Sequence, residues 1–303
     1  MNKTVLITGG TGLIGGHLCS KLNSKGFSVK LLSHRPGHTD SSFPVFKWDL
    51  KKRTIDPHAL DGITHIIHLA GAGIADKPWT KDYKKEILES RVLSAELLFN
   101  ALQQHKHQVE AVISASATGY YGDTGAMEVS ESSEPGQDFL SKVCLQWEKA
   151  IEEIGTLNIR TVSIRTGIVL TKEGGALPQL AFPVKLGLGA PLGEGDQYIP
   201  WIHIDDLVEI YIKALEDKTM RGPYNAVAPE PVTNAEITKA LASVLHKPLW
   251  LPAIPGWILK IVLGEKADLI LKGAKVSSKI ESAGFRFIYP HLKKALGNIY
   301  GNQ

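Results

Sequence analysis

The sequence predicts an α/β fold: a doubly wound parallel sheet with helices on both faces and a smaller C-terminal lobe. Short apolar runs alternate with amphipathic stretches over the first 165 residues, and a glycine-rich turn joins the first run to the first stretch. After residue 165, glycine and proline become frequent. Alternating strands and helices form parallel sheets, whereas glycine and proline mark loops, so a loop-rich part should lie over the sheet.

The predicted strands are almost continuously apolar, as expected for strands that helices cover on both faces. They span residues 4–8, 28–32, 65–69, 111–114 and 161–165, with a further short run at 224–227. The first helix should carry Leu13, Ile14, Leu18 and Leu22 on one face and end at Gly26. This unit of about thirty residues has the size of a single strand-helix-strand motif.

The second half of the chain divides less clearly. We expect one domain over residues 1–228, with a loop-rich insertion near 170–200, and a C-terminal lobe over residues 229–303. Helical spacing returns at Asp205, which should cap that helix. The final segment reads as helical, with a strand-like stretch at Gly284-Phe285-Arg286-Phe287.

Composition excludes several classes of protein. The formal charge is only +3, from 34 basic and 31 acidic residues spread along 303, so we expect neither a nucleic-acid nor a membrane partner. Cys19 and Cys144 are too few and too far apart for a metal or redox motif, and no metal site is expected. The first residues lack the pattern of a signal peptide, so the sequence predicts a cytoplasmic protein.

Glycines 9, 12 and 15 follow the first strand directly and open the first helix. The first permits a tight turn, the second lets the backbone approach a pyrophosphate, and the third allows close helix packing. The helix N-terminus adds unpaired N–H groups and the positive end of the helix dipole. This spacing in this context predicts a Rossmann-type site for a nicotinamide dinucleotide.

The end of the second strand distinguishes the two nicotinamide dinucleotides, because an acidic side chain there binds a free ribose 2′-hydroxyl. Here the chain reads Ser33-His34-Arg35, without an acid. Arg35 can bind a 2′-phosphate through two hydrogen bonds, and its neighbours can add more. We therefore predict NADP in preference to NAD. A solvated basic turn is the alternative.

Motifs along nearly the whole chain resemble the extended short-chain dehydrogenases/reductases, and within them the NAD-dependent epimerase/dehydratase-like proteins that end in a domain called DUF1731. The similar stretches are Thr8–Gly15, Asp49-Leu50, Leu69–Gly71, Trp79-Thr80, Ser90–Val92, Ser116–Gly122, Arg165–Leu170, Trp201–Asp206, Leu263–Glu265 and Gly284–Phe287. The DUF1731-like segment would span residues 249–297.

The resemblance, together with the motifs above, implies a set of cofactor-binding residues. They are Gly9, Thr11, Gly12, Leu13, Ile14, Ser33, His34, Arg35, Asp49, Leu50, Leu69, Ala70, Gly71, Lys142, Thr166, Gly167 and Ile168. The resemblance also implies Ser116 as a catalytic hydroxyl and Lys142 as the lysine that holds the nicotinamide ribose.

Two departures from the wider group bear on chemistry. Its members transfer protons with a Tyr-x-x-x-Lys pair, but the residue four before Lys142 is Asp138. Tyr121, or its neighbour Tyr120, is the nearest phenol that could replace the missing acid. The pyrophosphate-clamping arginine of sugar-nucleotide epimerases is also absent, since the chain reads Tyr198–Trp201 at that place.

Structural roles compete with each catalytic assignment. Ser116 can be a plain strand-end hydroxyl, the tyrosines can pack against a loop, and Lys142 can be a solvated helical lysine. His203 and Asp205 suggest catalysis or metal binding, but helix capping explains Asp205 better. Trp201, Trp250 and Trp257 would line a pocket or simply pack.

The predicted function is that of an NADP-dependent oxidoreductase or epimerase acting on an unidentified small molecule. The alternative is an NADP-binding sensor or interaction protein that has lost catalysis, which the departure at Asp138 favours. Ser116 and Lys142 favour the enzyme. The substrate, the direction of the reaction and the oligomeric state do not follow from the sequence.

Overall fold

A computed structural model of the chain describes residues 3–34 and 42–301. Within them the main sheet has eight strands in the order β11-β8-β6-β5-β1-β2-β3-β4, all parallel except β4. In chain order these are β1 (Thr4–Thr8), β2 (Ser28–Ser33), β3 (Val45–Asp49), β4 (Thr54–Ile55), β5 (His65–His68), β6 (Ala111–Ala117), β8 (Arg160–Thr166) and β11 (Gly222–Ala226). The α/β class and the doubly wound parallel sheet are confirmed.

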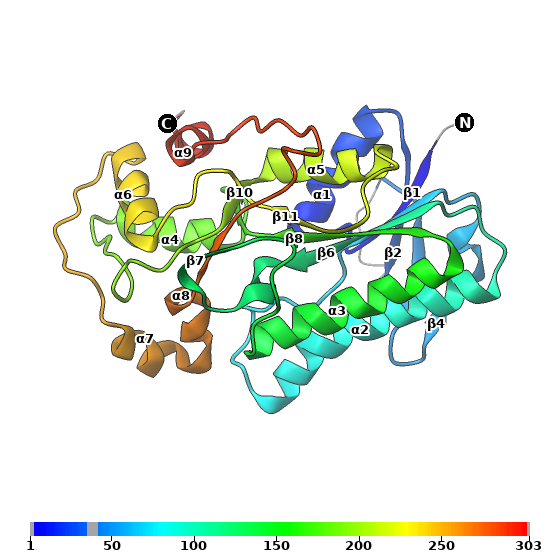
Figure 1. Ribbon diagram of the computed structural model, residues 1–303, viewed down its shortest axis with the longest axis horizontal. Coiled ribbons are helices and arrows are strands. Elements are labelled where there is room, and N and C mark those ends of the chain that lie inside the picture. The colour runs from blue at the N-terminus through cyan, green and yellow to red at the C-terminus, as the bar shows by residue number, and fades with distance from the viewer. Residues whose placement is uncertain (1–2, 35–41, 302–303) are drawn as a thin grey trace.

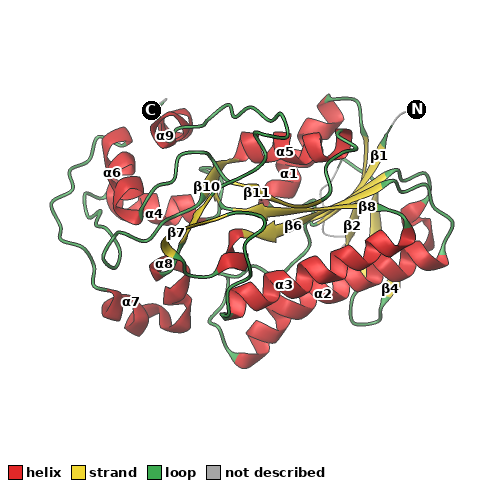
Figure 2. Ribbon diagram, in the orientation of Figure 1, coloured by secondary structure: helices red, strands yellow, loops and turns green. Residues whose placement is uncertain are grey.

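Helices cover both faces of this sheet, as Figures 1 and 2 show. The helices α1 (Leu13–Ser24) and α5 (Ile204–Glu216) lie on one face, and α2 (Lys81–Gln104) and α3 (Phe139–Ile154) lie on the other. Strand β1 contributes side chains to the cores on both faces of the sheet. Val5 and Ile7 pack in the core with α1 and α5, whereas Leu6 packs in the core with α2 and α3. This explains why the strands are apolar at every position.

A lobe beyond β8 carries the remaining elements, most of them at the left of Figure 1. They are β9 (Ile168–Leu170), α4 (Ala176–Lys185), β10 (Trp201–His203), α6 (Asn234–Val244), α7 (Gly256–Leu263), α8 (Asp268–Leu271), β12 (Ala274–Val276) and α9 (Leu292–Tyr300). The strand β7 (Gly125–Val129), from the turn after β6, pairs with β12, and β9 pairs with β10. Short 3₁₀ turns occupy Pro57–Leu60, Thr118–Tyr121, Gly155–Leu157 and Gly264–Ala267.

The lobe has a hydrophobic core of its own. Leu177 of α4, Leu241 of α6 and Leu296 of α9 are all buried in it. Residues from both sides of position 228 thus share one cluster, so the segment 170–200 and the C-terminal residues pack together. The exact division at residue 228 stays a prediction.

Local signals in the sequence are mostly confirmed, with two corrections. The first helix ends as expected, with Gly26 in the left-handed region at φ 84°. The cap of α5 is His203, whose Nδ1 accepts the Asp205 N–H at 3.1 Å, and not Asp205 itself.

The second correction concerns the stretch Gly284–Phe287, which forms no strand. Phe285 and Phe287 instead pack edge to face, with ring centroids 5.0 Å apart. The backbone that follows is held by the buried carboxylate of Asp206, which accepts the N–H groups of Ile288 and Tyr289 at 2.7 and 3.0 Å. The aromatic pattern came from packing against the core and not from sheet pairing.

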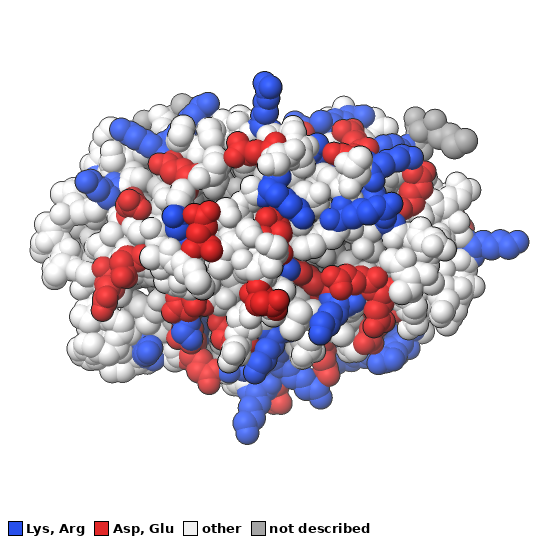
Figure 3. All heavy atoms as spheres, viewed as in Figure 1, with Lys and Arg blue, Asp and Glu red and all other residues white. Residues whose placement is uncertain are grey.

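The charges on the surface seen in Figure 3 are of both signs and lie interspersed. Among the described residues, no helix combines the length and the apolar character needed to cross a membrane.

Candidate functional site

The glycine turn has the geometry that its spacing predicts. Strand β1 ends at Thr8, Gly9 turns the chain at φ 68°, and the Gly12 N–H donates to the Gly9 carbonyl at 3.0 Å. Helix α1 begins at Leu13 with no side chain capping its N-terminus. The positive end of the α1 dipole therefore faces the carboxyl edge of the sheet.

The glycines of this turn are present for different reasons. A Cβ atom on Gly15 would lie 2.3 Å from the Gly9 oxygen, and one on Gly9 would lie 3.0 Å from the Leu69 carbonyl carbon, so the protein itself needs both glycines. A Cβ on Gly12 would meet only the Gly9 oxygen, at 3.3 Å, and Gly12 is exposed. The fold leaves this place open above the helix N-terminus, which fits a bound pyrophosphate.

The next strand end is fixed by hydrogen bonds that start at Thr8. The Thr8 hydroxyl accepts the N–H groups of Leu69 and Ala70, each at 3.1 Å, and contacts Nδ1 of buried His68 at 2.8 Å. Because the oxygen already accepts twice, its proton goes to Nδ1. The Nε2–H then donates to Ser94 Oγ at 3.1 Å, and Ser94 donates to a carbonyl of α2. A neutral His68 thus holds Leu69 and Ala70 beside Gly9.

The neutral state of His68 predicts a pH dependence of stability. Burial lowers the pKa of His68 to about 3, from a usual value of 6.5. Between these values the unfolded chain binds a proton that the folded chain excludes, so this stabilisation is complete above pH 6.5 and is lost as the pH falls toward 3. His65, whose pKa burial lowers to about 4, acts in the same direction.

We expect the free energy of unfolding to decrease as the pH is lowered from 6.5. His68→Gln should reduce the slope of this free energy against pH by up to the equivalent of one proton, about 1.4 kcal/mol per pH unit. Urea unfolding of both proteins between pH 4.5 and 7.5 measures this slope. Equal slopes would contradict the neutral buried histidine.

The other predicted cofactor residues lie at the carboxyl ends of neighbouring strands. Ser33, at the end of β2, is partly buried and His34 is exposed, whereas Arg35 lies outside the described residues. Asp49, at the end of β3, accepts the N–H groups of Lys51 and Lys52 at 3.0 Å, and the bond from Lys52 is the main cause that lowers its pKa.

Beyond β8, the segment Thr166–Ile168 is partly exposed. Gly167 is required by the close approach of Pro200, whose oxygen would lie 2.6 Å from a Cβ there. Glycine-loop residues 9–14, the turn 69–71 and residues 166–168 therefore share one edge of the sheet, where doubly wound proteins bind their ligands. Binding by each of these residues, and by Leu50 and Arg35, stays a prediction.

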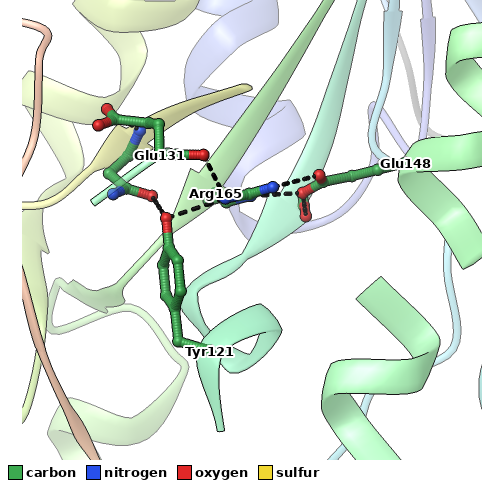
Figure 4. A network of polar contacts seen from close by, with 6 residues as sticks. Tyr121, Glu131, Glu148 and Arg165 are labelled. Atoms are coloured by element: carbon green, nitrogen blue, oxygen red, sulfur yellow. Dashed lines mark hydrogen bonds and ion pairs between the residues drawn. The ribbon is translucent and has the colours of Figure 1, made fainter. Parts of the chain in front are cut away.

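The catalytic candidates Ser116 and Tyr121 belong to one buried network (Figure 4). Ser116 Oγ donates to Glu148 Oε1 at 2.6 Å, and Arg165 donates to both Glu148 oxygens at 2.8 and 2.7 Å. The guanidinium also donates to the Tyr121 hydroxyl at 2.9 Å, which in turn donates to Asn225 Oδ1 at 2.7 Å. The network connects β6, α3, β8 and β11.

The electrostatics of this network keep Arg165 charged and Tyr121 neutral. Burial disfavours the charge on Arg165, but the hydrogen bonds and the charge of Glu148 outweigh it and raise the pKa of Arg165. Burial raises the pKa of Tyr121 to about 12, so its phenol stays protonated. The Ser116 proton is committed to Glu148. These contacts stabilise the fold, and the catalytic roles predicted for Ser116 and Tyr121 stay predictions.

Helix α3 shows where the Tyr-x-x-x-Lys spacing would act. Asp138 is the N-cap, since its carboxylate accepts the Ser141 N–H at 2.9 Å. Leu140, Cys144 and Glu148 lie four apart on one face, and a Cβ on Gly119, just beyond β6, would lie 3.4 Å from Leu140 and 4.0 Å from Cys144. This face meets the end of β6.

Lys142 is exposed and lies about 200° around the helix from Leu140 and Cys144. The structure therefore does not bring Lys142 together with Ser116. In its place on the inner face stands Cys144, whose pKa burial raises to about 12, so it is a neutral thiol. The residues four apart that face the strand end are thus a leucine and a cysteine, and neither can supply the cation of a Tyr-x-x-x-Lys pair.

Sequence reasoning missed the charged partners in this region. Glu148 and Arg165 each stand in an apolar context, next to Trp147 and inside β8, and such charges usually have a buried partner. This pattern in the sequence could have predicted an ion pair between Glu148 and Arg165. His203, by contrast, has a structural role. The centroids of its ring and the Tyr289 ring lie 4.0 Å apart, and its Nε2 contacts Asn298. Burial lowers the pKa of His203.

The fold and the glycine site define an extended short-chain dehydrogenase/reductase architecture with a nucleotide-binding site. A family model described as the NAD dependent epimerase/dehydratase family matches residues 5–226, and a domain of unknown function, DUF1731, matches residues 254–299. The chain belongs to the NAD dependent epimerase/dehydratase family.

Related proteins come from distant organisms. Epimerase family protein YfhF of Bacillus subtilis is 35% identical over 301 residues, 99% of this chain and 98% of YfhF. The chloroplastic epimerase family protein SDR39U1 homolog of Arabidopsis thaliana is 34% identical over 299 residues, 97% of this chain and 85% of that protein.

Solved structures agree with this assignment. The crystal structure of human epimerase family protein SDR39U1 (isoform 2) with NADPH superimposes with a TM-score of 0.88 at 32% identity, covering 99% of this chain and 100% of the human one. MoeE5 in complex with UDP-glucuronic acid and NAD has a TM-score of 0.78 at 21% identity, over 98% of each chain, which shows a shared fold alone.

Proposed function

We propose that this protein is an NADP(H)-dependent oxidoreductase or epimerase that acts on a small molecule at the carboxyl edge of its main sheet. The observation that carries the proposal is the open place at Gly12, directly above the uncapped N-terminus of α1. A bound pyrophosphate would accept hydrogen bonds from the first N–H groups of the helix, and the helix dipole would favour its charge.

The preference for NADP rests on the end of β2. Ser33 and His34 offer hydrogen bonds there, Arg35 follows them, and no carboxylate stands at these positions to repel a 2′-phosphate. The human relative whose structure contains NADPH supports the same choice. Its superposition covers 99% of this chain, and so both the glycine site and the lobe.

The bound dinucleotide would supply hydride transfer at its nicotinamide ring. The protein would position the ring beyond β6, at the carboxyl edge of the sheet. Proton transfer would come from a group other than the Tyr-x-x-x-Lys pair, and the Tyr121 phenol remains the candidate from the sequence. The expected location in the cytoplasm also stays a prediction.

Calorimetric titration tests the cofactor assignment. The native protein should bind NADPH more tightly than NADH, and Arg35→Ala should weaken NADPH binding by roughly tenfold, as for loss of one charge-assisted contact. Affinity for NADH should hardly change, because NADH has no 2′-phosphate. Equal affinity of the native protein for both dinucleotides would contradict the NADP preference.

Enzymatic function needs a separate measurement. Absorbance of the reduced nicotinamide at 340 nm, followed while hydroxy and carbonyl metabolites are screened, should reveal a substrate that is oxidised or reduced. Epimerisation returns the hydride to the substrate and leaves this absorbance unchanged, so NMR spectra of the same mixtures should reveal a substrate that is epimerised. NADPH binding without turnover of any of these compounds would instead favour a dinucleotide sensor.

A further inference from the structure

Arg91 lies on α2 with its guanidinium at the carboxyl edge of the sheet. The chain passes so close that a Cβ atom on Gly71, three residues after β5, would lie 3.0 Å from the guanidinium carbon. On the other side, this carbon lies 5.1 Å from the centre of the Trp147 ring of α3. One nitrogen donates to the Ile87 carbonyl at 2.9 Å, which fixes the orientation of the side chain.

This guanidinium carries a charge that the fold does not neutralise. Within residues 3–34 and 42–301, no carboxylate forms an ion pair with Arg91, in contrast to Arg165 with its two bonds to Glu148. Burial lowers the pKa of Arg91, so holding the charge here costs stability. A bound ligand whose oxygens accept hydrogen bonds from this guanidinium would offset that cost, so a partly buried arginine without a carboxylate partner at this edge of the sheet indicates a binding site.

The surroundings of Arg91 indicate which part of a dinucleotide it would meet. Its guanidinium lies beside Gly71, three residues after β5, and beside Trp147 of α3, and Ser94, one turn further along α2, contacts His68 at the end of β5. Strands β5 and β6 are neighbours, and β2, which carries the predicted 2′-phosphate site, lies beyond β1. Arg91 therefore stands on the side of the glycine turn away from the adenine.

We propose that Arg91 binds the nicotinamide half of NADP(H), through the ribose hydroxyls or the adjacent phosphate, and so replaces the cation that α3 lacks. This inference rests on the proposed function, because it assigns a residue to the same cofactor. On α3, the inner face has neutral Cys144 and the lysine at position 142 points away, so the neighbouring helix α2 supplies the positive charge. Arg91 is a positioning residue in this scheme: it fixes the nicotinamide ring relative to the substrate.

Two ligands separate this role from a structural one. NADPH contains both halves of the dinucleotide, whereas adenosine 2′,5′-bisphosphate contains only the adenine half. In calorimetric titrations, Arg91→Met should weaken NADPH binding about tenfold or more and change the affinity for the bisphosphate less than about twofold. Arg91→Lys keeps the charge but loses the planar guanidinium, so its NADPH affinity should lie between those of the native protein and Arg91→Met.

The control is Lys85→Met, which removes an exposed charge from the same helix and should leave both affinities unchanged. If Arg91→Met does not fold, Arg91→Lys decides: a selective loss of NADPH affinity supports the proposal, and no selective loss overturns it.

Unchanged NADPH affinity in folded Arg91→Met would overturn the proposal and leave the proposed function intact. An equal loss for both ligands would also overturn it, because it would show that Arg91 only supports the fold. If the native protein binds neither ligand, the proposed function fails and this inference fails with it.

Discussion

Gly12→Val should abolish dinucleotide binding in a protein that still folds. The backbone of Gly12 is extended, at φ −79° and ψ 175°, a conformation that valine adopts without strain. Its Cβ would meet only the Gly9 oxygen at 3.3 Å, so the branched side chain would point into the open place where a pyrophosphate should bind. Calorimetry with NADPH should detect no binding, while circular dichroism and the melting temperature stay near those of the native protein.

Two neighbouring glycines provide matched controls. Gly16 lies inside α1 with nothing within 4 Å of its Cβ position, so Gly16→Ala should stabilise the helix by about 0.5–1 kcal/mol and leave NADPH binding intact. Gly15→Val should prevent folding, because its Cβ would lie 2.3 Å from the Gly9 oxygen. Native NADPH affinity in folded Gly12→Val would mean that the turn only connects β1 to α1.

The sequence predicted the sheet better than the lobe, for a physical reason. Strands β1, β2, β5, β6 and β8 are short apolar runs bounded by turns, and each pairs with at least one neighbour that shows the same pattern. Helix α4 was not predicted, because Gly175 precedes it and Pro183 lies inside it. Its residues Leu177, Ala181 and Val184 nevertheless form a buried helical face. Strand β3 was missed because it is only half-buried and mixes charged with aromatic residues.

The cofactor site could be predicted to a greater extent than the catalytic one. The glycine turn is local, so spacing along the chain fixes its geometry, and the structure has that geometry. Catalytic groups come from separate elements. The face that Lys142 presents depends on the helical phase of α3, and the partner of Ser116 lies 32 residues away in sequence. Sequence motifs named these residues, but only packing decides which side chains meet.

The Glu148–Arg165 pair should be the most sensitive point of the buried network. Both side chains are almost completely buried, and Glu148 accepts three hydrogen bonds from Ser116 and Arg165. Glu148→Leu would leave the guanidinium without its carboxylate, at an expected cost of about 3–5 kcal/mol in the free energy of unfolding. Arg165→Met should cost a similar amount, because it leaves a buried carboxylate without its cation.

Chemical denaturation of the two single variants and the double variant measures how strongly the pair is coupled. The double variant should lose clearly less than the sum of the two single losses, since two apolar side chains can share the space without any unpaired charge. Glu89→Gln, which breaks the exposed Lys85–Glu89 pair on α2, should change stability by less than about 1 kcal/mol. Additive losses in the double variant would show that the two residues act independently. Strong coupling would mean instead that the charge pair holds β6, α3 and β8 in register, and with them the strand end at Ser116 where the substrate should bind.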